Sequence, residues 1–203
     1  SWLMEQIKFD GFVNRGISGA CLNSTLWCIQ DADLYTIEHG INDWGNRVPP
    51  GTMSDYVNNT KNGTFAAPYR QVIDKIRSTN PKAKIILCTP RKGYGFGNYL
   101  PARCDAKQSE RDGKKGYFLK DYANLVMAIA KKEKLPVADF YSTCGEQDEL
   151  EGLSIDKALH PNDAGYKRMA NILAKTMMKV YPNAELLANK KMVFTDDGKA
   201  KDV

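Results

Sequence analysis

Short apolar segments alternate with amphipathic segments of about 15 residues through most of this chain, and this alternation limits the folds open to it. Residues 34–37 and 84–88 are short and apolar, and the second segment is the continuous kind typical of a strand covered on both faces. Residues 65–79 and 117–134 carry apolar side chains at helical spacing. Strands that alternate with helices in this way predict a parallel sheet between two layers of helices.

Three further segments extend the pattern. Residues 2–8 are expected to be the end of a helix, and residues 12–14 a short strand that runs into the glycine-rich segment Arg15–Ala20. Residues 137–140, which follow Pro136, are expected to form another strand.

The last predicted helix begins after Asn162, a residue type that caps helix N-termini, and ends at Pro182. With 203 residues the chain is long enough for one domain with a sizeable core. We expect that domain over 1–187 and a polar tail over 188–203, in which Met192–Phe194 is part of a loose terminus or a short edge strand.

Composition excludes several classes of protein. Hydrophobic residues make up 42% and charged residues 26%, as in an ordinary globular chain. The formal net charge of +5 comes from scattered lysines, whereas a nucleic-acid binder would gather them in a patch, so no nucleic-acid partner is expected. No apolar run approaches the roughly 20 residues of a membrane span, so no integral membrane segment is expected.

The chain has five cysteines and no Cys-x-x-Cys pair, so neither a zinc nor a redox motif is present and no metal site is expected. Two pairings are compatible with the sequence, Cys21 with Cys28 and Cys104 with Cys144, and the odd count leaves at least one thiol free, most simply Cys88. The chain opens without a basic region before an apolar stretch, so it shows no signal peptide. A leader removed upstream would imply a secreted or periplasmic protein, and localisation stays open.

Ligands of a parallel α/β sheet bind at the carboxyl ends of its strands. Gly19, Asn42, Arg91 and His160 all follow predicted strands, Asn42 shortly after the segment 34–37. Backbone N–H groups of glycine and the side-chain amide of Asn can stabilise an oxyanion, although Gly and Asn also serve as plain turn residues.

A general base working near neutral pH is most often a histidine, and the chain has two, His39 and His160. His160 precedes a capped helix, where a side chain can project into a cleft, whereas His39 at a strand end is better explained as a buried histidine. The segment Gly16-Ile17-Ser18-Gly19-Ala20 lacks the final glycine of a Gly-x-Ser-x-Gly nucleophile elbow, so Ser18 is a weak nucleophile candidate.

Taken together, three segments resemble the SGNH hydrolases, also called GDSL-type esterases and lipases. Asn14–Gly19 is similar to the family's second block, Gly40–Trp44 to its third, and His160–Tyr166 to its last. The resemblance covers roughly residues 1–182. It implies a three-layer α/β/α sandwich of the SGNH, flavodoxin-like type with a parallel sheet.

The resemblance also implies acyl transfer through a serine nucleophile, without metal or cofactor. His160 would be the general base, and Asn42 and Gly19 would form the oxyanion hole. Asp43, Trp44 and Arg91 would contact the substrate, a small-molecule or carbohydrate ester. The polar segment 90–116, with Tyr94, Phe96 and Tyr99, would shape the pocket unless it is only a surface loop.

Two departures from the family pattern have consequences. No Gly-Asp-Ser occurs in the chain, so the nucleophile and the first, central strand of the fold are expected to be missing from the sequence as printed. The family places an Asp three residues before the histidine, where this chain has Lys157. Asp156, one residue earlier, would orient His160, or else the backbone would do so in a Ser–His dyad.

Two alternatives stay open. The absent serine is compatible with a non-catalytic SGNH-like module that binds carbohydrate or protein. A Cys–His hydrolase that uses Cys21 or Cys144 is the other alternative.

Overall fold

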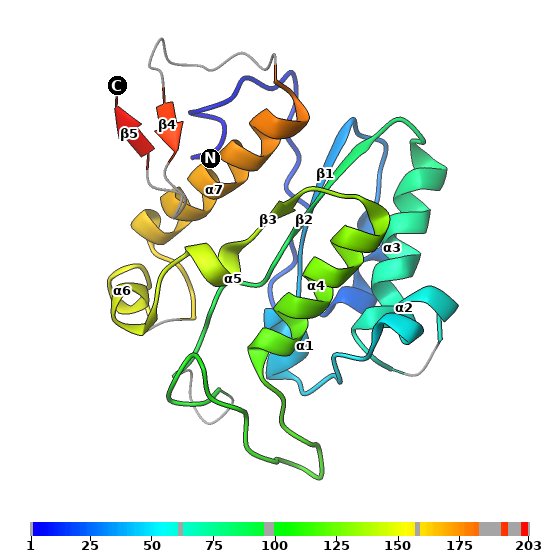
Figure 1. Cartoon of the computed structure of the whole chain (residues 1–203), viewed down its shortest axis with the longest axis vertical. Coiled ribbons are helices and arrows are strands. Elements are labelled where there is room, and N and C mark those ends of the chain that lie inside the picture. The colour runs from blue at the N-terminus through cyan, green and yellow to red at the C-terminus, as the bar shows by residue number, and fades with distance from the viewer. Residues whose placement is uncertain are drawn as a thin grey trace.

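The computed structural model of the chain describes residues 2–60, 63–95, 100–156, 159–182, 192–194 and 200–202. A parallel sheet in the order β1-β2-β3 lies at its centre (Figure 1). The strands are β1 Leu34–Glu38, β2 Lys84–Cys88 and β3 Val137–Ala138. Leu34 pairs with Lys84 and Glu38 with Cys88, so the carboxyl ends of β1 and β2 are level at one edge of the sheet.

Helices connect and cover these strands. Their bounds are α1 Ile41–Gly45, α2 Met53–Asn58, α3 Ala66–Thr79, α4 Leu119–Glu133, α5 Phe140–Thr143, α6 Gln147–Gly152 and α7 Asp163–Val180. Two 3-10 turns, Leu22–Ser24 and Leu26–Cys28, precede β1. Helices α3, α4 and α7 confirm the helices expected from periodicity, and Asn162 caps α7 as predicted, since its Oδ1 accepts from the Gly165 N–H at 3.0 Å.

The side chains of β2 alternate between two cores, which makes the fold a three-layer sandwich. Ile85 and Leu87 join the core formed with α3 and α4, whereas Ile86 and Cys88 join the core formed with α7. Figure 1 shows α7 on one side of the sheet and α3 and α4 on the other. The three-layer α/β fold expected from the sequence is therefore confirmed.

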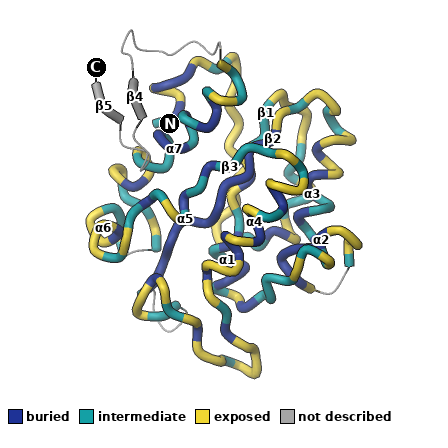
Figure 2. The backbone as a smooth tube through the Cα atoms, in the orientation of Figure 1, coloured by how far each residue is buried: buried dark blue, intermediate teal, exposed yellow. Residues whose placement is uncertain are grey.

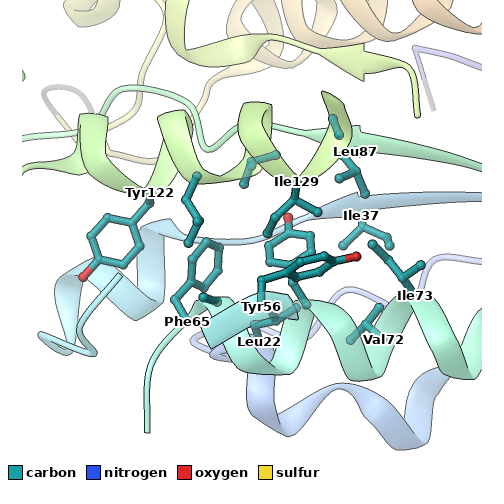
Figure 3. Packing of buried hydrophobic residues seen from close by; sticks show 14 of the residues in the cluster. Leu22, Ile37, Tyr56, Phe65, Val72, Ile73, Leu87, Tyr122 and Ile129 are labelled. Carbon is teal, nitrogen blue, oxygen red and sulfur yellow. The ribbon is translucent and has the colours of Figure 1, made fainter. Parts of the chain in front are cut away.

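Aromatic side chains fill the larger core (Figure 3). The rings of Phe65 and Tyr69 meet edge to face with centroids 5.1 Å apart, and Phe65 lies 5.3 Å from Tyr122. Such pairs add to the free energy of burial by about 0.5–1.5 kcal/mol each. This core fixes α3 and α4 against β1 and β2.

Two N-terminal expectations are wrong. Residues 2–6 form turns rather than a helix, in which the N–H groups of Gln6 and Ile7 both donate to Leu3 O. Residues 12–14 are not a strand, and Phe12 and Val13 are 46% and 69% exposed. A strand needs a hydrogen-bonded neighbour, and among the described residues β1 pairs only with β2.

The strand expected over 137–140 is shorter than predicted. It ends at Ala138 because Asp139 caps α5, accepting from the Ser142 N–H at 3.2 Å and from the Thr89 hydroxyl at 2.9 Å. The side chain of Asp139 thus favours a helix start over another residue of strand.

Met192–Phe194 forms β4, which pairs antiparallel with β5, Ala200–Asp202, and does not join the parallel sheet. The rest of the expected tail lies outside the described residues, and the domain limits stay a prediction. Among the helices that the structure describes, none has both the length and the apolar character needed to cross a membrane.

Candidate active site

A glycine lets the chain turn directly from β1 into α1. Gly40 has a φ of 123°, and a Cβ atom there would lie 3.2 Å from Pro90 Cγ and 3.4 Å from Phe65 Cζ. Only glycine adopts this conformation and leaves this space readily. As a result, Asn42 and Asp43 stand in the first turn of α1 at the carboxyl edge of the sheet.

The structure brings Asn42 together with the segment that carries Gly19. The Asn42 side-chain amide donates to Ala20 O at 3.2 Å, and Gly19 lies in the preceding exposed turn with a φ of 73°. The two predicted oxyanion-hole residues therefore belong to neighbouring segments. This contact uses one N–H of the Asn42 amide. The amide carries a second N–H, which is a further hydrogen-bond donor.

Asp43 is buried rather than placed to contact a substrate. It is 2% exposed, and its carboxylate accepts the Leu22 N–H at 3.1 Å. Burial raises the pKa of Asp43 to about 6, although hydrogen bonds from the N–H groups of Leu22, Asp43 and Gly40 oppose the rise. Asp43 thus ties α1 to the segment that follows Gly19.

The raised pKa of Asp43 predicts a pH-dependent stability. The unfolded chain releases this proton near pH 4 and the folded chain only near pH 6, so the folded state binds more protons in between. Asp43→Asn is the reference, because its amide oxygen can still accept the Leu22 N–H but does not titrate. As the pH rises from about 4 to about 6, the unfolding free energy of the wild type should fall by about 3 kcal/mol relative to this variant. Denaturant unfolding of both proteins at several pH values measures the difference; parallel curves would contradict the prediction.

Trp44 is also internal. It is fully buried in the core, and its indole N–H donates to Tyr117 O at 2.8 Å. The side chain therefore anchors α1 to the segment before α4, in contrast to the substrate contact expected from its place beside Asn42.

His160 lies in a loop whose two sides are joined by hydrogen bonds. The Ile155 N–H donates to His160 O at 2.9 Å, and the His160 N–H donates to Asp156 Oδ1 at 2.7 Å. The second oxygen, Oδ2, contacts the imidazole Nδ1. The imidazole is 55% exposed, so the geometry is that of a histidine oriented by a carboxylate and open toward solvent.

The electrostatics of this pair are consistent with a carboxylate that stays ionised. Partial burial pushes the pKa of Asp156 upward. The hydrogen bonds from the His160 backbone and imidazole, together with the His160 charge and the Leu159 N–H, outweigh burial and hold the pKa below its ordinary value. Lys157, which stands at the family's usual Asp position, lies outside the described residues. Asp156 does reach His160, through both of its carboxylate oxygens.

Arg91 is buried and faces the His160 loop rather than an open pocket. It is 5% exposed, and its guanidinium donates to Ser154 Oγ at 2.7 Å, to Leu159 O at 3.3 Å and to Leu153 O at 3.4 Å. The substrate contact expected of Arg91 does not fit this placement. Sequence reasoning missed the loop contacts of Leu153 and Ser154, since nothing in their types signals them.

His39 and the cysteines fit a catalytic role poorly. Burial lowers the pKa of His39 to about 4, which keeps its imidazole neutral at physiological pH. All five cysteines are free thiols, and burial raises the pKa of Cys144 to about 12 and also raises that of Cys21. Because the thiolate is the nucleophile, these thiols are poor candidates for a Cys–His mechanism.

The segment after β2 and helix α6 line an open cavity of about 310 Å³. Its lining comprises Tyr94, Gly95, Ala102, Gln147 and Glu151. The Tyr94 hydroxyl donates to Glu151 Oε1 at 2.9 Å. The cavity thus lies against the helix that leads into the Asp156–His160 loop. Of the other residues expected to shape a pocket, Phe96 and Tyr99 lie outside the described residues.

Comparison with known proteins decides the family. The model of the GDSL-like Lipase/Acylhydrolase family matches residues 1–168. The chain belongs to this family. Membership in a family of GDSL-like lipases and acylhydrolases supports hydrolase activity.

Solved structures of GDSL-type and other proteins show the same fold. A possible lipase from Chitinophaga pinensis DSM 2588 is 24% identical with a TM-score of 0.67, over 88% of this chain and 84% of that chain. A protein from Lactobacillus plantarum is 20% identical with a TM-score of 0.62, over 83% and 79%. A peptidoglycan O-acetylesterase is 16% identical with a TM-score of 0.52, over 80% of this chain and 41% of its own. No curated protein sequence matched the chain.

Proposed function

We propose that this GDSL-family chain is a serine ester hydrolase that acts on small acyl esters, with His160 as its general base. The observation that carries the proposal is the contact between Asp156 and the imidazole Nδ1 of His160. A carboxylate on Nδ1 fixes the tautomer that presents a basic Nε2, which is the arrangement a serine nucleophile requires. The exposed imidazole leaves room for a substrate.

The reaction proceeds in two acyl transfers. His160 takes the proton of the serine hydroxyl as its oxygen attacks the ester carbonyl, and then gives that proton to the departing alcohol. Water, activated in turn by His160, hydrolyses the acyl-enzyme and releases the acid. The printed sequence holds no Gly-Asp-Ser, so the proposal leaves the position of the serine open.

Asn42 and Gly19 serve as the oxyanion hole in this proposal. The hydrogen bond from Asn42 to Ala20 O supports it, because that bond holds the amide beside the turn that carries the Gly19 N–H. Such preorganised donors stabilise the charge that develops on the carbonyl oxygen.

We propose a small acyl group, such as acetyl, on a carbohydrate alcohol. The cavity beside α6 supports a polar alcohol group, since Tyr94, Gln147 and Glu151 are side chains able to hydrogen-bond sugar hydroxyls. A peptidoglycan O-acetylesterase shares the fold. No metal or cofactor enters the proposal.

Hydrolysis of para-nitrophenyl esters by the product of the complete gene tests the proposal. We expect kcat/KM for the acetate to exceed that for the long-chain palmitate, and a serine-directed phosphonate to abolish both activities. Activity that survives the phosphonate but is lost after thiol alkylation would point to a cysteine instead, and a preference for palmitate would refute the small acyl group.

A non-catalytic binding module is the second candidate, favoured by the lack of Gly-Asp-Ser in the printed sequence. The gene sequence before Ser1 separates the two. A strand followed by Gly-Asp-Ser supports the enzyme, and its absence supports the module.

A further inference from the structure

The buried stretch that begins with β2 continues past the end of the strand. All residues from 85 to 94 are buried, visible as an unbroken dark segment in Figure 2, although the strand ends at Cys88. Arg91 lies in this continuation. Burying a charged guanidinium is costly unless its N–H groups are hydrogen-bonded, so the contacts that Arg91 makes carry weight.

Three hydrogen bonds join the Arg91 guanidinium to the loop that carries His160. One terminal nitrogen, Nη1, donates to Leu159 O, and the other, Nη2, donates to Leu153 O and Ser154 Oγ. Leu153 and Ser154 stand where the loop leaves α6, and Leu159 immediately precedes His160. A single side chain therefore holds both ends of the loop to the buried segment that follows β2.

We propose that Arg91 is a positioning residue that fixes the His160 loop, and with it the Asp156–His160 pair, at the carboxyl edge of the sheet. The effect of Arg91 on ester hydrolysis rests on the proposed function, whereas its effect on the position of the loop does not. A planar guanidinium spans separated acceptors in fixed directions, which the point charge of lysine does not reproduce.

The charge of Arg91 also bears on the pair. Its burial lowers its pKa, whereas Cys144, Asp156 and Tyr166 nearby oppose that effect and Arg168 adds to it. The attraction between Arg91 and the Asp156 carboxylate acts in the same direction as the hydrogen bonds that hold the pKa of Asp156 low.

Nuclear magnetic resonance of the chain tests the proposal without any need for catalysis. The carboxyl carbon of Asp156 reports its titration, and the Nδ1 proton of His160 reports the contact between the two side chains. Arg91→Met should raise the pKa of Asp156 toward its ordinary value and broaden or remove the Nδ1 signal. Arg91→Lys should restore these signals only in part.

Arg103→Met is the matched control, because Arg103 lies in the same segment but is exposed, and its guanidinium pairs with Asp105, two residues away. It should leave both signals unchanged. If Arg91→Met does not fold, Ser154→Ala removes one acceptor of the guanidinium and should raise the pKa of Asp156 by a smaller amount. A wild-type titration of Asp156 in folded Arg91→Met would overturn the proposal, and so would a wild-type titration in Ser154→Ala if Arg91→Met does not fold.

In the product of the complete gene, Arg91→Met should lower kcat for para-nitrophenyl acetate by about 10- to 100-fold with KM within about threefold, as misplacement of a base does. Equal kcat in the two proteins would contradict a positioning role. Failure of the wild type to hydrolyse any ester would count against the proposed function, while the resonance measurements would still decide the role of Arg91.

Discussion

Replacing His160 with Ala should lower kcat/KM for para-nitrophenyl acetate by about 10⁴-fold or more in the product of the complete gene. Without the imidazole no group removes the serine proton, and the loss of one member of a serine triad costs this much in well-studied hydrolases. KM should change little, because the imidazole acts in the transition state. Steady-state kinetics of the purified variant measure the effect.

His39→Gln is the matched control, since His39 and His160 are the only histidines in the chain. The pKa of His39 lies near 4, so it is neutral at the assay pH and offers no charge to lose. We expect activity within about threefold of wild type. If His39→Gln were inactive and His160→Ala active, the general base would be His39 and not His160.

Asn42→Ala should lower kcat for the same substrate by about 100- to 1000-fold, the usual loss on removal of one oxyanion-hole donor. The Asn42 amide also donates to Ala20 O, so the variant loses a contact to the Gly19 turn as well. Because the oxyanion forms only in the transition state, KM should stay within a few-fold of wild type.

Asn46→Ala serves as the control for this prediction. Asn46 lies one turn further along, is exposed, and donates to Asn42 O at 2.8 Å and toward Cys21 Sγ. Asn46 is the same residue type as Asn42 and lies close to it, but it is not proposed to contact the substrate. Its replacement should therefore lower kcat by less than about threefold. An equal loss of kcat in both variants would show that Asn42→Ala acts only by disturbing the local structure of α1.

The sequence predicted the main elements because their periodicity is strong. β1, β2, α3, α4 and α7 bury one face or both, and burial imposes the spacing of apolar residues on which the prediction rests. The strand expected over 12–14 failed for the opposite reason. Its apolar residues depend on a hydrogen-bonded partner elsewhere in the fold, and a local pattern does not reveal whether that partner is present.

The placement of some candidate residues was predictable from residue type and position, while their catalytic roles stay a prediction. Asn42, Gly19 and His160 are residue types suited to acyl transfer that follow predicted strands, and the structure sets Asn42 beside the Gly19 turn. Asp43 and Arg91 are polar residues at the same edge, yet both are buried and make hydrogen bonds within the protein. Which way such a side chain points depends on the packing of distant segments, and residue type alone does not fix it.

If His160 activates a serine, that serine can be trapped by a reagent that reacts only with an activated hydroxyl. The product of the complete gene is incubated with a fluorophosphonate, and the site of the adduct is located by peptide mass spectrometry in the wild type and in His160→Ala. We predict one phosphonylated serine in the wild type and labelling slowed by at least about 100-fold in the variant. Absence of a serine adduct in the wild type, or equal labelling rates in the two proteins, would contradict the account.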